Sequence, residues 1–238
     1  MCFHYSLTKE RIEIALQLHA EWDDDFTPVF HANAFDFPLM PVITQGTPGK
    51  IQLFQWGLLP HWIKTKQEAE KFRMQTLNAR CESIFDKPSF RTYIGNNRCL
   101  VLADGFFEWM DFQKKKYPHY IFLKEHQLFS FGGIYSRWVD KETGEIINTF
   151  SILTTDANPM VARIHNIKKR MPVIIPKEKY SAWLQKDLPK EKIMELLAQY
   201  PETEMTTHTI SKRITSRTEN SNARETIDPF EYPELSFI

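Results

Sequence analysis

Cysteine, net charge and long apolar runs are all scarce in this sequence of 238 residues. Its three cysteines are too few and too scattered for a disulfide framework or a paired-cysteine zinc site, and they are typical of a reducing cytoplasm. Thirty basic and thirty acidic residues cancel, which excludes a globally basic nucleic-acid coat and restricts any such binding to a local patch. No apolar run could span a bilayer and no signal-peptide core is present, so we expect a cytoplasmic protein without a membrane partner.

The chain does contain many strand-like segments. Five β-branched or aromatic runs are separated by turn residues and charges, namely RCLVLADG, HYIFLK, QLFSFGGIYS, INTFSILTT and RMPVII. Apolar spacing predicts a helix from an N-cap at Thr8 to about His19, and Pro-Lys-Glu at 176 and 189 predicts two more helices. No linker divides residues 1–238. We therefore predict a single α+β domain with a β-rich, barrel-like core and flanking helices.

Cys2 is the first candidate for chemistry, because removal of the initiator Met would leave it with a free α-amine. The amine and the thiol would then lie on adjacent carbons, with ordinary pKa values of about 8 and 8.5. The amine can condense with an aldehyde to an imine, and the thiolate can close on the imine carbon to give a five-membered thiazolidine. The alternative is a chance cysteine in a frayed terminus.

Three further segments carry polar side chains that could serve such a reaction. Glu108 lies among aromatics in GFFEWM, where burial would raise its pKa and make it a proton acceptor; alternatively it points to solvent. If NARCES is extended, Asn78 could orient an amine and Arg80 could bind a phosphate, although both could equally be solvated. His165 is the side-chain type best suited to proton transfer at neutral pH.

Basic and aromatic residues near these segments could contact an anionic polymer. Lys168, Lys169 and Arg170 follow His165 and would suit a phosphate backbone, but a surface loop of solvated charges is an equally good interpretation. Trp62, in WGLLPHWI, is either core or a base-stacking platform. We expect neither a metal nor a cofactor.

Taken together, these segments resemble the SOS-response-associated peptidase (SRAP) family, whose members shield abasic sites in single-stranded DNA by covalent cross-linking. The resemblance rests on the initial Met-Cys and on WGLLPHW, NARCES, RCLVLADGFFEW, SILTTDAN and IHN followed by RMPVI, in family order over most of the chain. It implies an SRAP-type β-rich fold that encloses a site at the mature N-terminus.

The resemblance also implies roles for four residues. Cys2 would be the nucleophile, and Asn78 would position its α-amine. Glu108 would accept protons and assist the release of Met1. His165 would be the acid that helps to open the abasic sugar to its aldehyde. The implied product is a thiazolidine that joins the protein to the DNA.

The implied partner is single-stranded DNA with abasic sites, bound by a monomer. Arg80 and Arg170 would hold phosphates, and Trp62, Lys168 and Lys169 would add DNA contacts. Three segments depart from the family pattern: Phe3-His4 replaces the usual Gly-Arg, HNIKKRMP has three extra residues, and HANAFDFPLMP replaces Asn-Val-Ala-Pro near residue 35. None of these departures removes a catalytic role.

Two other functions remain open from the residues. An N-terminal-nucleophile cysteine amidohydrolase or peptidase would use Cys2, Glu108 and His165 in similar roles on a small or peptide substrate. A non-covalent binder of single strands would use the aromatics and the basic residues at 168 to 170, and would not need the Cys2 thiol.

Overall fold

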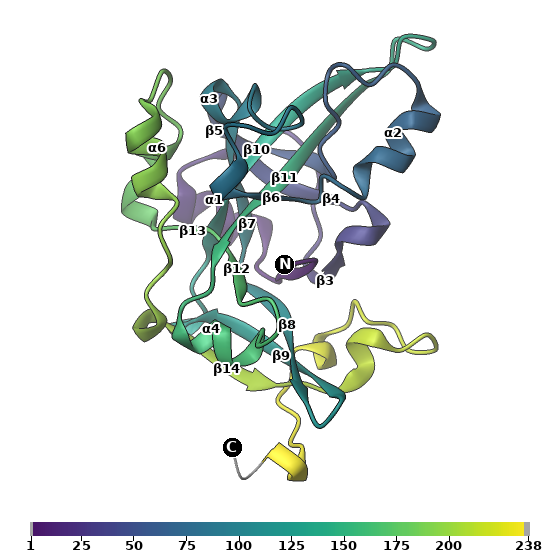
Figure 1. The fold of residues 1–238 in the computed structure, drawn as a ribbon, viewed down its shortest axis with the longest axis vertical. Coiled ribbons are helices and arrows are strands. Elements are labelled where there is room, and N and C mark those ends of the chain that lie inside the picture. Colours follow the sequence, from purple (N-terminus) through teal and green to yellow (C-terminus); the bar gives the residue numbers. More distant parts are fainter. Residues whose placement is uncertain (1, 236–238) are drawn as a thin grey trace.

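Five strands close into a barrel in the computed structural model of the protein, which describes residues 2–235 (Figure 1). In ring order they are β5 (Thr47–Trp56), β4 (Leu39–Thr44), β7 (Arg98–Ala103), β10 (Phe129–Val139) and β11 (Ile146–Asp156). Neighbours along this order are antiparallel, and a parallel pairing of β11 with β5 completes the ring. The predicted α+β fold with a barrel-like core is confirmed.

A second sheet of five strands lies beside the barrel. Its order is β14 (Met205–Thr209), β9 (Lys115–Leu123), β8 (Gly105–Phe112), β1 (His4–Leu7) and β3 (Val29–Asn33). β1 is paired on both sides, and Cys2, two residues before it, lies in the interior. Figure 1 shows the start of the chain near the middle of the molecule and the other end at its lower extremity.

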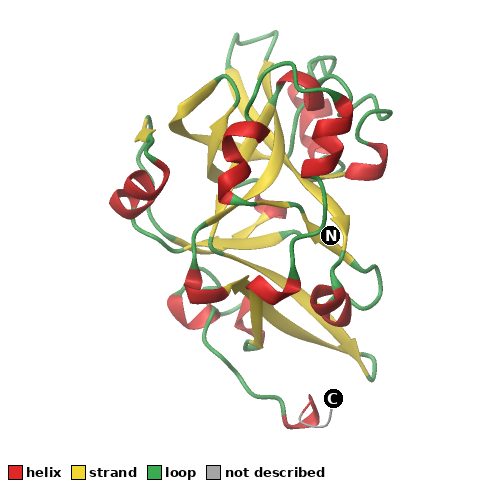
Figure 2. Cartoon of the chain, turned by 90° about the vertical axis from the view of Figure 1, so that its left-hand side faces the viewer, coloured by secondary structure: helices red, strands yellow, loops and turns green. Residues whose placement is uncertain are grey.

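Shorter elements flank the two sheets, with the helices around the strands in Figure 2. The short strands are β2 (Glu21–Trp22), β6 (Asn78–Arg80), β12 (Arg170–Pro172) and β13 (Ile174–Ile175). The α-helices are α1 (Arg11–Leu18), α2 (Lys66–Arg73), α3 (Tyr93–Asn96), α4 (Pro159–Ile164), α5 (Tyr180–Trp183) and α6 (Lys190–Leu196). The 3-10 helices are η1 (Ala34–Asp36), η2 (Cys81–Ser83), η3 (Lys124–His126), η4 (Lys177–Lys179), η5 (Glu202–Glu204), η6 (Lys212–Thr215), η7 (Arg224–Thr226) and η8 (Pro233–Leu235). Within residues 2–235, no helix has the length and apolarity that a membrane crossing requires.

The helix expected near the N-terminus begins later than predicted, and Thr8 does not cap it. The Thr8 hydroxyl and backbone N–H both donate to Asp104 Oδ2, each at 2.6 Å, and Glu10 occupies the N-cap position of α1. A tertiary carboxylate therefore outcompetes local capping by the threonine. The two helices predicted after Pro-Lys-Glu are confirmed as α6, directly after Pro189, and as η4 followed by α5.

Gly105, at the start of β8, leaves room for the ring of Tyr120 on the neighbouring strand β9 of the same sheet. A Cβ built there would lie 2.2 Å from the ring of Tyr120, whose hydroxyl is held 2.9 Å from that of Ser6. We expect Gly105→Ala to lower the free energy of unfolding by about 3 kcal/mol, measured by denaturant titration, because the ring cannot move without breaking this contact. The control is Gly49→Ala, where nothing lies within 4 Å and the change should stay below about 1 kcal/mol. Equal effects of the two variants would contradict this account of the packing.

Candidate active site

Glu108 is buried because of its position along β8. Successive residues of a strand face opposite sides, so Glu108 shares its side with Phe106, which belongs to the main core, while Phe107 packs into a separate cluster. The carboxylate is 4% exposed, and burial raises its pKa to about 7. The inward orientation considered from the sequence is confirmed, and the carboxylate can exchange protons near neutral pH.

Cys2 lies fully buried at the entry to β1, with its backbone held by Asn78. The Asn78 side-chain amide donates to the Cys2 carbonyl oxygen at 2.8 Å, and β6 is itself fixed by parallel pairing with β11. The Cys2 thiol donates to the His4 carbonyl at 3.4 Å. Burial, and then the negative charge of Glu108, raise the thiol pKa, so a nearby proton acceptor is required to generate the thiolate.

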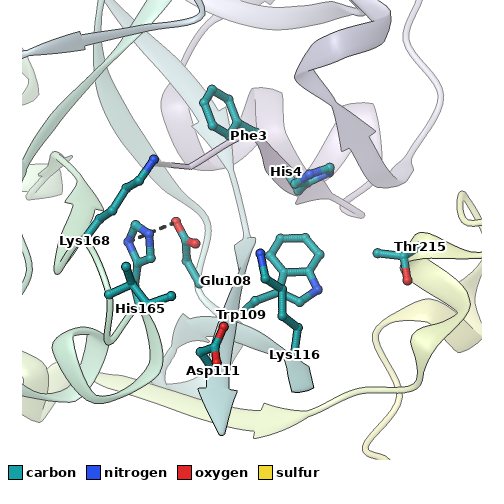
Figure 3. Close-up of a pocket in the computed structure, with 10 residues that line it drawn as sticks. Phe3, His4, Glu108, Trp109, Asp111, Lys116, His165, Lys168 and Thr215 are labelled. Atoms are coloured by element: carbon teal, nitrogen blue, oxygen red, sulfur yellow. Dashed lines mark ion pairs between the residues drawn. The ribbon is translucent and has the colours of Figure 1, made fainter. Parts of the chain in front are cut away.

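His165 is presented by the end of α4. Asn158 caps the start of this helix by accepting from Val161 N–H at 2.9 Å, and His165 is the residue that follows its last turn. The His165 Nδ1 atom lies 3.9 Å from Glu108 Oε1, the pair marked in Figure 3, and 2.8 Å from the Arg170 carbonyl oxygen. With the Nδ1 hydrogen donated to that carbonyl, the second proton of the imidazolium is on Nε2.

The pKa of His165 is lowered chiefly by burial. The positive charges of Lys168 and Arg170 lower it further. A neutral imidazole is therefore favoured at neutral pH, and the protonated form is a strong donor when it occurs. The three extra residues after His165 form a turn in which Lys169 N–H donates to the His165 carbonyl at 2.8 Å.

Asn166 joins the two elements that carry Glu108 and His165. Its amide donates to the Asp111 carbonyl at 2.8 Å and accepts from Asp111 N–H at 3.1 Å, so the turn after α4 is fastened to β8. Sequence reasoning missed this contact, because it joins positions 55 residues apart. The only local sign of this contact in the sequence is the asparagine that directly follows His165.

A cavity of about 370 Å³ gives access to this constellation. Its lining includes Glu108, His165 and Lys168, together with Phe3, His4, Trp109, Asp111, Lys116, Ile167 and Thr215 (Figure 3). Cys2 and Asn78 do not line it, but Cys2 directly precedes Phe3. Within residues 2–235, no group of three or more His, Cys, Asp or Glu side chains could hold a metal ion.

Among the residues predicted to contact DNA, one lines the cavity. Lys168 lines it, whereas Lys169 is exposed on the turn and its carbonyl accepts from Ala157 N–H at 2.9 Å. Arg80 is exposed at the end of β6. Trp62 is 43% exposed and lies with Phe72 beside a separate hollow, their ring centroids 5.0 Å apart. DNA contacts by these residues stay predictions.

Arg170 is largely buried and bound by two carboxylates. Its guanidinium donates to Glu82 at 2.5 and 3.0 Å and to Asp156 at 2.8 Å, and it also reaches the Thr154 carbonyl at 2.7 Å. These contacts fasten η2 and β12 to β11. A phosphate would have to compete with both carboxylates for the same donors. Arg80 is therefore better placed than Arg170 for the expected phosphate contact.

Known proteins resemble this chain over most of its length. The family model described as SOS response associated peptidase (SRAP) matches residues 1–217. The abasic site processing protein YoqW of Bacillus subtilis (strain 168) is 33% identical over 228 residues, which are 93% of this chain and 97% of that protein. The abasic site processing protein HMCES of Gallus gallus is 31% identical over 164 residues, 60% of this chain but 48% of its own length.

Solved structures show the same fold. A crystal structure of a protein from Bacteroides thetaiotaomicron is 37% identical, has a TM-score of 0.91, and covers 97% of this chain and 100% of its own. One from Bordetella bronchiseptica, 22% identical with a TM-score of 0.78, covers 88% of this chain and 100% of its own and is similar in fold alone. Residues 1–217 thus match the family model, and the curated relative spans nearly the whole chain. The chain belongs to the SOS response associated peptidase family.

Proposed function

We propose that this protein processes abasic sites in single-stranded DNA by a covalent cross-link through Cys2, after removal of Met1. The observation that carries the proposal is a chain of contacts that links four residues distant in sequence. Asn78 donates to the Cys2 carbonyl, the charge of Glu108 acts on the Cys2 thiol, and Glu108 lies 3.9 Å from His165 where both line the cavity. Two relatives are named as abasic site processing proteins, one that matches most of this chain and one that matches part of it. Their names and the contacts above support the proposal.

The chemistry requires two bond-forming steps. The Cys2 α-amine adds to the aldehyde of the opened abasic sugar, and loss of water gives an imine. The Cys2 sulfur then attacks the imine carbon while its proton passes to the nitrogen, which closes a thiazolidine. One water is released overall, and no oxidant or reductant takes part. Closure removes the imine, which would otherwise invite β-elimination and a strand break.

Glu108 is suited to receive protons in this sequence, and His165 to supply one. With a pKa of about 7, the Glu108 carboxyl can accept a proton from the amine or the thiol and release it again. An abasic sugar is mostly a closed hemiacetal, so an acid must protonate the ring oxygen before the aldehyde exists. Protonated His165 can supply this proton through Nε2, because Nδ1 is engaged with the Arg170 carbonyl.

His165→Ala should slow cross-linking to a natural abasic site by about 100-fold, the usual contribution of a positioned general acid. Its effect on a pre-opened aldehyde analogue should be much smaller, since that substrate needs no ring opening. Time courses on denaturing gels with the two DNAs measure both rates. Equal losses on the closed and the open substrate would show that the acid role belongs to another residue.

Arg80→Ala should weaken binding to single-stranded DNA to a similar degree for all sequences, because a phosphate contact reads no bases. The slope of log affinity against log salt should become shallower by about 0.7 for one lost contact. Fluorescence anisotropy over a salt series measures this slope. Lys177→Ala, an exposed cation on η4, is the matched control, and an unchanged slope in Arg80→Ala would refute the contact.

The alternative function is a cysteine amidohydrolase or peptidase that uses the same residues on a small or peptide substrate. Incubation with an oligonucleotide that carries one abasic site separates the two functions. Our proposal predicts an adduct that survives heating in detergent and is absent with undamaged DNA. An enzyme that forms no such adduct but hydrolyses amide substrates would support the alternative.

A further inference from the structure

Aromatic rings cluster at the mouth of the active-site cavity. The ring centroids of Phe3 and Phe35 are 5.0 Å apart, those of His4 and Phe35 are 6.3 Å apart, and those of His4 and Trp109 are 4.9 Å apart. Phe3, His4 and Trp109 line the same cavity as Glu108 and His165 (Figure 3). Phe35 does not line the cavity itself and is 43% exposed. We call Phe3, His4, Phe35 and Trp109 the aromatic rim.

The backbone holds the aromatic rim in place. β1 pairs with β3 so that His4 faces Asn33, and Ala34 N–H donates to the Phe3 carbonyl at 2.8 Å. The Asn33 side chain accepts from Phe35 N–H at 3.2 Å and so starts the 3-10 turn that carries the Phe35 ring. Two of the segments that depart from the family pattern thus meet here and form one surface. A preformed surface binds a ligand without a further ordering cost.

The aromatic rim carries no cation that could attract a phosphate. His4 Nδ1 lies 2.8 Å from His31 Nε2, an arrangement in which one ring donates and the other accepts. Burial lowers the pKa of His4 to about 3 and that of His31 to about 4, so both rings are neutral under physiological conditions. The cations of the cavity lie elsewhere on its lining, at Lys116 and Lys168.

We infer that the aromatic rim, through Phe35 and Phe3, stacks the unpaired nucleobase that adjoins the abasic nucleotide. This inference rests on the proposed function. A sugar bound at Cys2 brings its neighbouring nucleotide to the mouth of the cavity, where an exposed apolar ring is continuous with the catalytic residues. Every base offers a π-face to such a ring, so the contact selects for an intact, unpaired neighbour and not for one sequence.

The test uses an unreactive DNA, so it does not depend on the cross-link. One oligonucleotide carries a single tetrahydrofuran abasic analogue between two adenines, and a second carries three consecutive tetrahydrofurans. We expect anisotropy to show about tenfold weaker binding of wild-type protein to the second DNA, the loss of one stacked base. The Phe35→Ala variant should bind the first DNA about tenfold more weakly than wild type does. Its affinity for the second DNA should be little lower than its affinity for the first.

The matched control is Phe230→Ala, which removes a phenylalanine of similar exposure, 46%, at the other end of the chain and should bind like wild type. Phe35→Leu keeps apolar bulk without the ring and should resemble Phe35→Ala, which separates stacking from folding. Equal affinity of wild type for the two DNAs, or additive losses from Phe35→Ala and the missing bases, would overturn the inference. Failure of the proposed function would appear instead as no adduct with a reactive abasic site.

Discussion

Cys2→Ser is expected to reduce the heat-stable adduct with abasic DNA by more than about 100-fold. A serine hydroxyl closes a ring on an imine far less readily than a thiolate, so the reaction should stop at the labile imine. The buried sulfur lies close enough to Glu108 for the carboxylate to raise its pKa, which suits a thiol that loses its proton only as it attacks. Denaturing gels run after heating measure the surviving adduct.

Borohydride provides the control for Cys2→Ser. It reduces an imine to a stable amine, so the variant should yield a durable adduct with borohydride and almost none without it. That result would show that the variant folds, binds DNA and retains a reactive α-amine. A Cys2→Ser adduct as durable as that of wild type without borohydride would refute the thiazolidine.

Glu108→Gln should slow cross-linking by about 1000-fold on both closed and pre-opened substrates, within the range for loss of a general base. The amide keeps the shape of the carboxyl group but cannot accept a proton. On the pre-opened substrate, which needs no proton from His165, wild-type rates should rise with pH through about 7 as Glu108 ionises, and again near 8 as the α-amine becomes neutral. The variant should lose the first rise and keep the second. The same variant should retain Met1 if Glu108 drives self-processing, as intact mass would show.

The stability of Glu108→Gln separates this role from a folding defect. Burial raises the pKa of Glu108 above its unfolded value, so the folded state binds the extra proton and stability falls as pH rises from about 4.5 to about 7. The neutral amide avoids this loss. We expect the variant to unfold with a free energy about 3 kcal/mol higher than wild type at pH 8, and about equal at pH 4. A variant that is less stable at pH 8 would contradict the burial of a charged carboxylate.

Much of the barrel could be predicted from the sequence because its strands are locally unambiguous. RCLVLA is buried along its whole length in β7, and FSFGGIYS begins β10, so these predicted runs do form strands of the barrel. Glu108 could be singled out from the sequence because burying a carboxylate among three aromatic residues costs free energy, and proteins accept such a cost mainly at functional sites. Its burial then follows from strand alternation.

Contacts between distant segments could not be predicted in the same way. Thr8 bonds to Asp104, Arg170 to Glu82 and Asp156, and Asn166 to the backbone of β8, and each is decided by the tertiary fold. The aromatic rim joins Phe3 to Phe35 through the β1–β3 pairing, and no local sequence pattern predicts this pairing. Local sequence identifies the residue types, but the register of the strands decides which of them meet.

The most direct measurement of the proposed chemistry is the mass of the cross-linked N-terminal peptide. Wild-type protein is incubated with an oligonucleotide that carries one abasic site, then digested with nuclease and protease, and the modified peptide is sequenced by mass spectrometry. The account predicts a peptide that begins at Cys2, lacks Met1, and carries the mass of the sugar remnant minus one water on Cys2. An adduct on a lysine, or on a chain that still begins with Met1, would contradict it.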